Sequence, residues 1–134
     1  MLEWLRRKKE IPLTGAPAVR RQKTYSAASG YVYQYFYEGQ RPAERNGHLG
    51  AQYVFNVSSD RKSSSAMSVF LSEESLTAWQ TQHERQLGST ERYAIAKMAL
   101  FQAFDQREKP ADMAAEVLVQ TQDVESILAT LDIG

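Results

Sequence analysis

Hydrophobic and polar residues alternate most clearly between residues 25 and 38, which include the stretch YVYQYFYE. Tyrosines fill every second position of that stretch, and successive side chains of a strand point to opposite faces of a sheet. Residues 51–59 and 65–72 are also rich in β-branched and aromatic residues, and polar loops separate them. The pattern predicts three strands in an antiparallel meander.

After residue 72 the hydrophobic pattern changes to a helical period. Apolar residues recur at spacings of three and four from Leu76 to Leu87. Ser72 is suited to cap the start of this helix, and Gly88 is suited to end it. A second helix is expected to follow, with residues 93–104 apolar almost all round, as in a helix buried on most sides.

The C-terminal part of the chain adds two shorter predicted elements. Residues 116–120 read EVLVQ and form a candidate fourth strand, and Thr121 precedes an amphipathic stripe typical of a last helix. The whole pattern predicts an α+β fold. We expect an antiparallel three- to four-stranded sheet (meander) with two to three helices packed mainly on one face.

Alternation along the three strands sorts their side chains into two faces. We expect the tyrosines to lie under the helices, with those at the strand ends near the rim. The opposite face carries a small apolar centre among polar residues, namely Phe36, Val54 and Phe70. Such a face is typical of a protein–protein contact, so these three residues are candidates for an interface. Alternatively, the N-terminal arm or a late strand or helix from residues 111–133 covers this face.

The chain length of 134 residues fits one domain. Residues 1–24 are predicted to form a basic, flexible N-terminal arm, because Pro12, Gly15 and Pro17 interrupt any helix. Residues 25–134 form the single α+β domain. Residues 39–50 are interpreted as a long connection between strands.

Charge is balanced overall but unevenly distributed. Residues 1–45 carry nine basic and four acidic side chains, a net charge of +5, and the remainder carries seven and twelve, a net charge of −5. Such a dipole favours self-association or a partner recruited by the basic end. The candidates for nucleic-acid contact are the basic residues of the arm: Arg6, Arg7, Lys8, Lys9, Arg20, Arg21 and Lys23.

Several protein classes are disfavoured by composition. The chain has no cysteine, which excludes disulfides and thiolate chemistry, and no apolar run approaches the length of a membrane span. Charges near the N-terminus disfavour a signal peptide. We expect a cytoplasmic protein of bacterial type without a transmembrane segment.

The inventory of chemistry-bearing residues is small. The two histidines, His48 and His83, are far apart in sequence, and no phosphate-binding glycine loop, dinucleotide fingerprint or metalloprotease motif occurs. We therefore predict no catalytic residue, no metal site and no cofactor. If a ligand site exists, we expect it where residues 39–50 meet the strand ends, with Tyr37, Arg41, Arg45 and His48 around an anion or polar metabolite.

These observations favour a non-enzymatic binding or interaction domain that acts as a homodimer or with a protein partner. One alternative is single-stranded nucleic-acid binding through the basic arm and the sheet aromatics. The acidic remainder of the chain weakens that alternative, because it repels phosphates. A second alternative is a cofactorless small enzyme, or an anion or metabolite binder, at residues 39–50.

Overall fold

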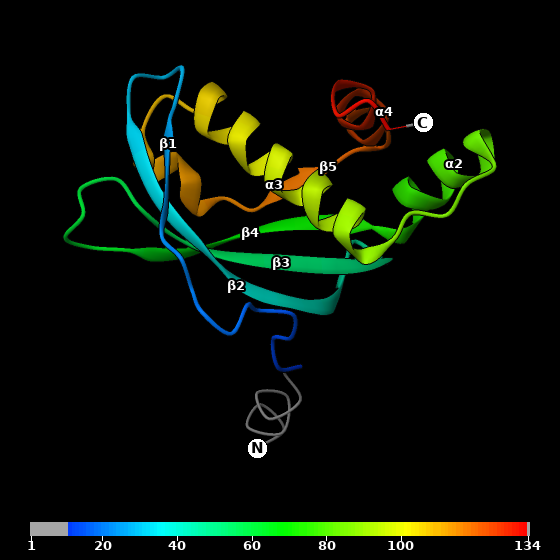
Figure 1. Ribbon diagram of the computed structural model, residues 1–134, viewed down its shortest axis with the longest axis horizontal. Helices are drawn as coiled ribbons and strands as arrows, with labels where there is room; N and C mark the ends of the chain where they lie inside the picture. Colours follow the sequence, from blue (N-terminus) through cyan, green and yellow to red (C-terminus); the bar gives the residue numbers. More distant parts are fainter. Residues whose placement is uncertain (1–10, 134) are drawn as a thin grey trace.

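The computed structural model of the protein describes residues 11–133. Their elements, in chain order, are β1 (Lys23–Ser26), β2 (Val32–Arg45), β3 (His48–Ser58), β4 (Ser65–Ser72), α2 (Glu73–His83), α3 (Ser89–Gln106), the 3-10 helix η1 (Pro110–Ala114), β5 (Val117–Val119) and α4 (Thr121–Thr130). The α+β class predicted from the sequence is confirmed. Figure 1 shows the three α-helices of the described residues together on one side of a curved sheet.

The sheet has five strands in the order β1-β2-β3-β4-β5. The first four pair antiparallel as a meander, but β5 runs parallel to β4, with Val69 opposite Val117 and Leu71 opposite Val119. The prediction of a purely antiparallel sheet with three to four strands is therefore only partly right. The predicted strand at residues 116–120 exists, and its parallel direction follows from the long helical crossover that precedes it.

The alternating stretch 25–38 is two strands rather than one. The chain reverses at residues 27–31, where the N–H of Ala27 donates to the carbonyl of Tyr31 at 2.9 Å. Gly30 allows this turn because its φ of +98° lies in the left-handed region. The single strand predicted over these residues was wrong. The alternation of residue types continues through the turn, so the sequence pattern does not reveal where the chain reverses.

Residues 39–50 form a hairpin and not a connection, so that prediction was also wrong. Strand β2 continues to Arg45, and a two-residue turn at Asn46 and Gly47 leads directly into β3. Both turn residues have positive φ, 54° and 82°, as a tight hairpin turn requires. Pro42 is tolerated within the strand because this half of β2 lies at the edge of the sheet.

The helices begin close to where the sequence places them. Ser72 caps α2, since its hydroxyl oxygen accepts from the N–H of Ser75 at 3.1 Å. The helix ends at His83, however, and Glu84 takes the left-handed conformation with a φ of 50°. Gly88 therefore caps the start of α3 instead of ending α2 as predicted.

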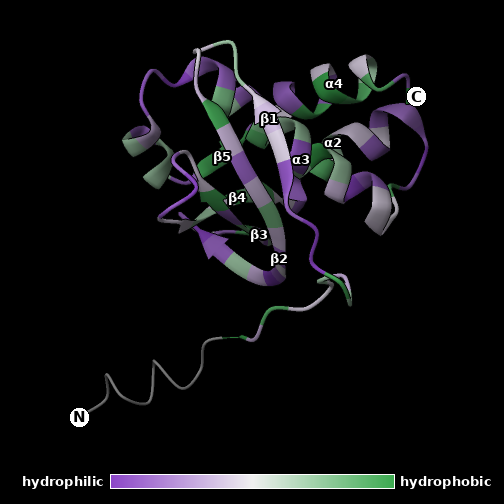
Figure 2. Ribbon diagram, turned by 60° about the vertical axis from the view of Figure 1, so that its left-hand side comes forward, coloured by the Kyte–Doolittle hydropathy of each residue, from purple (hydrophilic) through white to green (hydrophobic). Residues whose placement is uncertain are grey.

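The tyrosine side of the sheet forms the core under the helices, as the alternation predicts. Tyr33 and Tyr35 are buried, and the ring of Tyr33 stacks on Phe104 of α3 at 4.2 Å between centroids. Tyr31, at the end of the strand, is 41% exposed. Figure 2 shows hydrophobic residues along the middle of the sheet and hydrophilic residues toward the turn at the end of β2.

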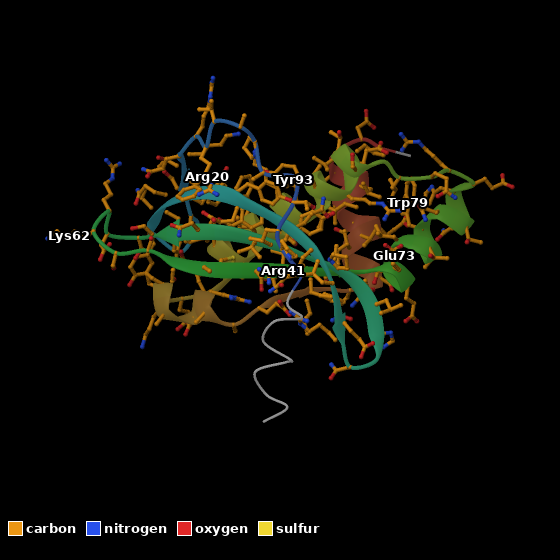
Figure 3. All side chains as sticks on the ribbon, turned by 90° about the horizontal axis from the view of Figure 1, so that it is seen from below. Arg20, Arg41, Lys62, Glu73, Trp79 and Tyr93 are labelled. Carbon is orange, nitrogen blue, oxygen red and sulfur yellow. The ribbon has the colours of Figure 1, made fainter. Side chains whose placement is uncertain are left out.

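No helix of the described residues covers the other side of the sheet, which we call the open face. Figure 3 looks onto this face, with Arg20 and Lys62 at one end and Glu73 and Trp79 at the other. The face carries Phe36, Val54 and Phe70, whose positions in the register alternate with those of the core residues. It is thus assembled from the same strands as the core.

The described part of the N-terminal arm, residues 11–22, is called the arm segment here. Thr14 and Gln40 exchange two backbone hydrogen bonds of 2.8 Å, so the arm segment meets the outer half of β2. It then leaves β2 and rejoins it as β1, where Lys23 lies opposite Tyr35. The arm segment has no regular secondary structure between these two contacts, where it runs alongside residues 36–39 of β2.

Candidate functional site

A β-bulge divides the residues predicted to form a ligand site. Tyr37 lies opposite Phe55 on the core side, and the next paired residue of β2 is Gly39, opposite Val54 on the open face. The extra residue, Glu38, moves Arg41 and the following odd-numbered positions to the other side of the sheet. Tyr37, Arg41 and the Arg45–His48 pair consequently border three different pockets.

Arg45 and His48 do lie together, at the end of the β2–β3 hairpin. Arg45 donates two hydrogen bonds to the carboxylate of Glu116, at 2.6 and 3.0 Å, and its guanidinium lies 5.4 Å from the ring centroid of Phe70. His48 Nδ1 lies 2.7 Å from Glu74 Oε2. Their pocket of about 330 Å³ is therefore bordered by groups that already have partners.

The three interface candidates differ in what they expose. Val54 and Phe70 are buried, at 7% and 4% exposure. Phe36 is half-buried, and the guanidinium of Arg20 lies 5.9 Å from its ring centroid. Among these three, only Phe36 offers an appreciable surface to a partner.

The basic residues of the arm fall in two groups. Arg6, Arg7, Lys8 and Lys9 lie outside the described residues. Arg20, Arg21 and Lys23 belong to the arm segment and the start of β1, and Arg20 Nη1 lies 3.6 Å from Glu38 Oε1.

The arm segment, the bulged part of β2 and the start of α3 enclose a pocket of about 600 Å³, which we call the arm pocket. It is bordered by Gly15, Pro17, Val19, Arg21, Lys23, Tyr35, Phe36, Tyr37, Gln40, Ser89, Thr90 and Tyr93. Residues from all three candidate sets meet there, since Tyr37 comes from the ligand set, Phe36 from the interface set, and Arg21 and Lys23 from the nucleic-acid set. Sequence reasoning missed Tyr93, Ser89 and Thr90. The pocket that they border forms only because the arm segment pairs with β2, and the sequence pattern does not indicate that pairing.

Aromatic rings form the inner wall of the arm pocket. The rings of Tyr37 and Tyr93 lie 4.7 Å apart between centroids, and Tyr37 also contacts Phe55. Burial raises the pKa of Tyr35, Tyr37 and Tyr93, and neighbouring phenols raise it further at the first two. These hydroxyls are therefore neutral at ordinary pH, and a neutral phenol can donate a hydrogen bond to a ligand.

Cations also lie on the border of the arm pocket or close to it. Arg21 and Lys23 border it, and Lys97 follows Tyr93 by one turn of α3. Desolvation lowers the pKa of Lys97, and the nearby Lys23 lowers it further. Among the ion pairs of residues 11–133, neither lysine has a carboxylate within 4.0 Å. Two like charges thus lie close together beside an aromatic wall.

Other kinds of site find little support in the described part of the chain. Residues 11–133 contain no group of three or more acidic or histidine side chains placed to hold a metal ion. His83 stacks on Trp79 at 4.3 Å and contacts Glu125 at 3.1 Å, which places it at the rim of the helix layer. None of the helices in these residues is both long and apolar enough to cross a bilayer.

Comparison of the chain with protein-family models, curated proteins and solved structures gave no match. The functional argument therefore depends on the geometry of the arm pocket and of the open face.

Proposed function

We propose that this protein is a binding domain that holds a small anionic ligand with a flat apolar part in the arm pocket. The observation that carries the proposal is that aromatic rings and the cations Arg21 and Lys23 border the same pocket of about 600 Å³, with Lys97 close to Lys23. Concave sites with mostly apolar walls and a few charged groups are typical of small-molecule sites. This proposal moves the predicted anion or metabolite site from residues 39–50 to the arm segment.

The lysine pair supports an anionic partner. Lys23 and Lys97 repel each other, and each lacks a carboxylate partner among the described residues. An anion placed between them would neutralise both charges and form charge-assisted hydrogen bonds. Binding therefore removes an unfavourable interaction as well as adding favourable ones.

The other end of the site supports the flat apolar part of the ligand. Tyr37 and Tyr93 present ring surface, and their neutral hydroxyls add hydrogen-bond donors. The start of α3 at Ser89 and Thr90 also borders the pocket, and the positive end of a helix dipole favours negative charge. Like the lysine pair, these features favour the binding of an anion with a flat apolar part.

The proposal is tested by calorimetric titration with benzoate and phenyl phosphate, with benzyl alcohol as a neutral analogue. We expect saturable binding of at least one anion, weakened about tenfold or more by Lys23→Met or Lys97→Met. Lys109→Met is the matched control, because Lys109 is an exposed lysine beyond the far end of α3. Equal binding of benzyl alcohol, or equal losses in all three variants, would contradict the proposal.

A second copy of this chain on the open face is a second candidate partner. It is favoured by the absence of a helix from that face among residues 11–133 and by the exposure of Leu118, which is 45% exposed beside Phe70 on the next strand. The opposite net charges of the two parts of the chain also favour self-association. Light scattering tests it: a dimer should persist in high salt and dissociate in Leu118→Asp, and a wild-type monomer at both salt concentrations would refute it.

A further inference from the structure

The loop between β3 and β4 forms a second, more polar pocket on the open face, which we call the hairpin pocket. It has a volume of about 220 Å³ and is bordered by Gln22, Gln34, Phe36, Asn56, Ser58, Arg61, Lys62, Ser63 and Ser64. The loop lies at the opposite end of the sheet from α2 (Figure 1), and Lys62 lies at the same end as Arg20 (Figure 3). This pocket has its own cations, Arg61 and Lys62, and shares Phe36 with the arm pocket.

Gln34 is the unusual residue of the hairpin pocket. Its side chain lies on the open face of β2, where it is 4% exposed, and its carbonyl oxygen has no hydrogen-bond partner. Buried polar atoms are almost always paired. This oxygen has almost no accessible surface of its own, so a donor from outside the chain would pair with it once the side-chain amide turns into the pocket.

A flat ring with hydrogen-bonding edges fits the surroundings of Gln34. Phe36 follows two positions along the same strand face and presents a half-buried ring to the pocket. Asn56, opposite Phe36 in the register, adds an amide that both donates and accepts. Base–aromatic stacking next to side-chain amides is how proteins commonly hold an unpaired nucleobase.

Asp60 holds the backbone of the loop that carries Arg61 and Lys62. One carboxylate oxygen of Asp60 accepts from the N–H groups of Lys62 and Ser63, at 2.8 and 2.9 Å. Arg61 takes the left-handed conformation between these contacts, with a φ of 63°. The loop thus presents Arg61 and Lys62 in a fixed backbone conformation at the border of the pocket, as a phosphate site requires.

We propose that the hairpin pocket binds a nucleotide, with its base on Phe36, a donor of the base on the carbonyl of Gln34, and its phosphate toward Arg61 and Lys62. The same chemistry is offered by a free mononucleotide and by one nucleotide of a single strand. The tyrosines Tyr33 and Tyr35 are buried under the helices, so Phe36 supplies the base platform among the sheet aromatics.

The test is calorimetric titration of the full chain with each of the four ribonucleoside monophosphates, with a short single-stranded oligodeoxynucleotide of mixed sequence, and with ribose 5-phosphate. We expect at least one nucleotide ligand to bind saturably and ribose 5-phosphate to bind at least about tenfold more weakly, since it lacks the base. An affinity of the mononucleotide within about threefold of the strand identifies the free nucleotide as the ligand. A strand about thirtyfold tighter than every mononucleotide identifies nucleic acid.

Gln34→Leu is the decisive variant, because it keeps the size of the side chain and removes the unpartnered oxygen. We expect it to weaken nucleotide binding about tenfold while the melting temperature stays equal or rises, which separates lost binding from lost folding. Arg61→Ala is expected to weaken binding similarly, and Arg85→Ala, in the segment between α2 and α3, is its charge-matched control. The proposal is overturned if no nucleotide binds at millimolar concentration, if ribose 5-phosphate binds as tightly, or if Gln34→Leu binds unchanged because water serves the oxygen.

Discussion

The two faces of the sheet are built from the same strands and differ in what covers them. On the core side, aromatic side chains stack against α3 in a continuous cluster that includes Tyr33, Tyr35 and Phe104. On the open face, single aromatic residues are separated by polar and charged groups, as at Phe36 beside Gln34 and Phe70 beside Arg45. The difference teaches that aromatic packing under the helices stabilises the first face, whereas polar and ionic contacts hold the second, where Phe36 stays partly exposed.

The largest expected effect comes from the core side. Phe104→Ala removes a fully buried ring that stacks on Tyr33 at 4.2 Å, so we expect the free energy of unfolding to fall by about 4 kcal/mol. Phe36→Ala on the open face should cost only about 1 kcal/mol, since that side chain is only partly buried. Urea unfolding followed by circular dichroism measures both, and equal losses would mean that the open face is as well covered as the core.

Gly50→Ala should break the open face itself. Phe70 is able to lie flat there because Gly50, on the neighbouring strand, has no side chain: an added Cβ would lie 2.8 Å from Phe70 Cζ and would also clash with the carbonyl oxygen of Leu71. We expect a loss of about 3 kcal/mol in the same unfolding experiment. Gly88→Ala, where a Cβ meets nothing within 4 Å, is the control and should cost about 1 kcal/mol or less. Similar losses in both variants would show that the ring of Phe70 does not depend on Gly50.

Glu116 tests the polar part of the open face through pH. Burial raises the pKa of Glu116, but the hydrogen bonds from Arg45 and Ser68 and the charge of Arg45 outweigh burial, so the pKa is lowered from 4.5. A lowered folded pKa stabilises the fold above the ordinary carboxyl pKa, and that stabilisation disappears as pH falls. Glu116→Gln should therefore unfold more easily than the wild type by about 2 kcal/mol near neutral pH.

This difference between Glu116→Gln and the wild type should shrink as the pH falls below 4.5, where the wild-type carboxylate also becomes protonated. Denaturant unfolding at a series of pH values measures it. A difference that stays constant into the acid range would show that the ionised carboxylate is not what stabilises this part of the sheet.

The smallest expected effect concerns the β3–β4 loop. Hydrogen bonds from the N–H groups of Ser63 and Lys62 lower the pKa of Asp60 to about 2, so the loop keeps its shape far into the acid range. Asp60→Ala should leave global unfolding nearly unchanged but speed hydrogen exchange of the Lys62 and Ser63 amides about tenfold. The amide of Thr24 in the β1–β2 pair is an internal control and should exchange at the wild-type rate. Unchanged exchange at Lys62 and Ser63 would mean that the loop is held by other contacts.

Sequence reasoning recovered the features that depend on local periodicity. The alternation of the tyrosines placed Tyr33 and Tyr35 in the core, and the spacing after Ser72 gave the start of α2. It also gave the short strand that became β5, but not its direction, because direction depends on where the preceding crossover ends.

The candidate ligand site could not be predicted, since one extra residue decided it. A bulge at Glu38 reverses the face of every later position in β2. The local sign of it is Gly39, since a glycine within a strand pattern can mark a bulge, but it does not say which residue is the extra one. The arm pocket was missed for a related reason. It depends on the long-range pairing of Thr14 with Gln40. No hydrophobic periodicity around either residue indicates that the two pair.

The borders of the sheet also determine how the molecule behaves at high concentration. An exposed edge strand is a template on which another chain can add, and natural sheets limit this risk with proline, bulges and short edge strands. At one border, β2 has the bulge at Glu38, Pro42 in its outer half and the arm segment across its middle. At the other border, β5 is only three residues long. Both borders therefore resist the addition of a strand from another copy edge to edge, although no helix of the described residues covers one face of the sheet.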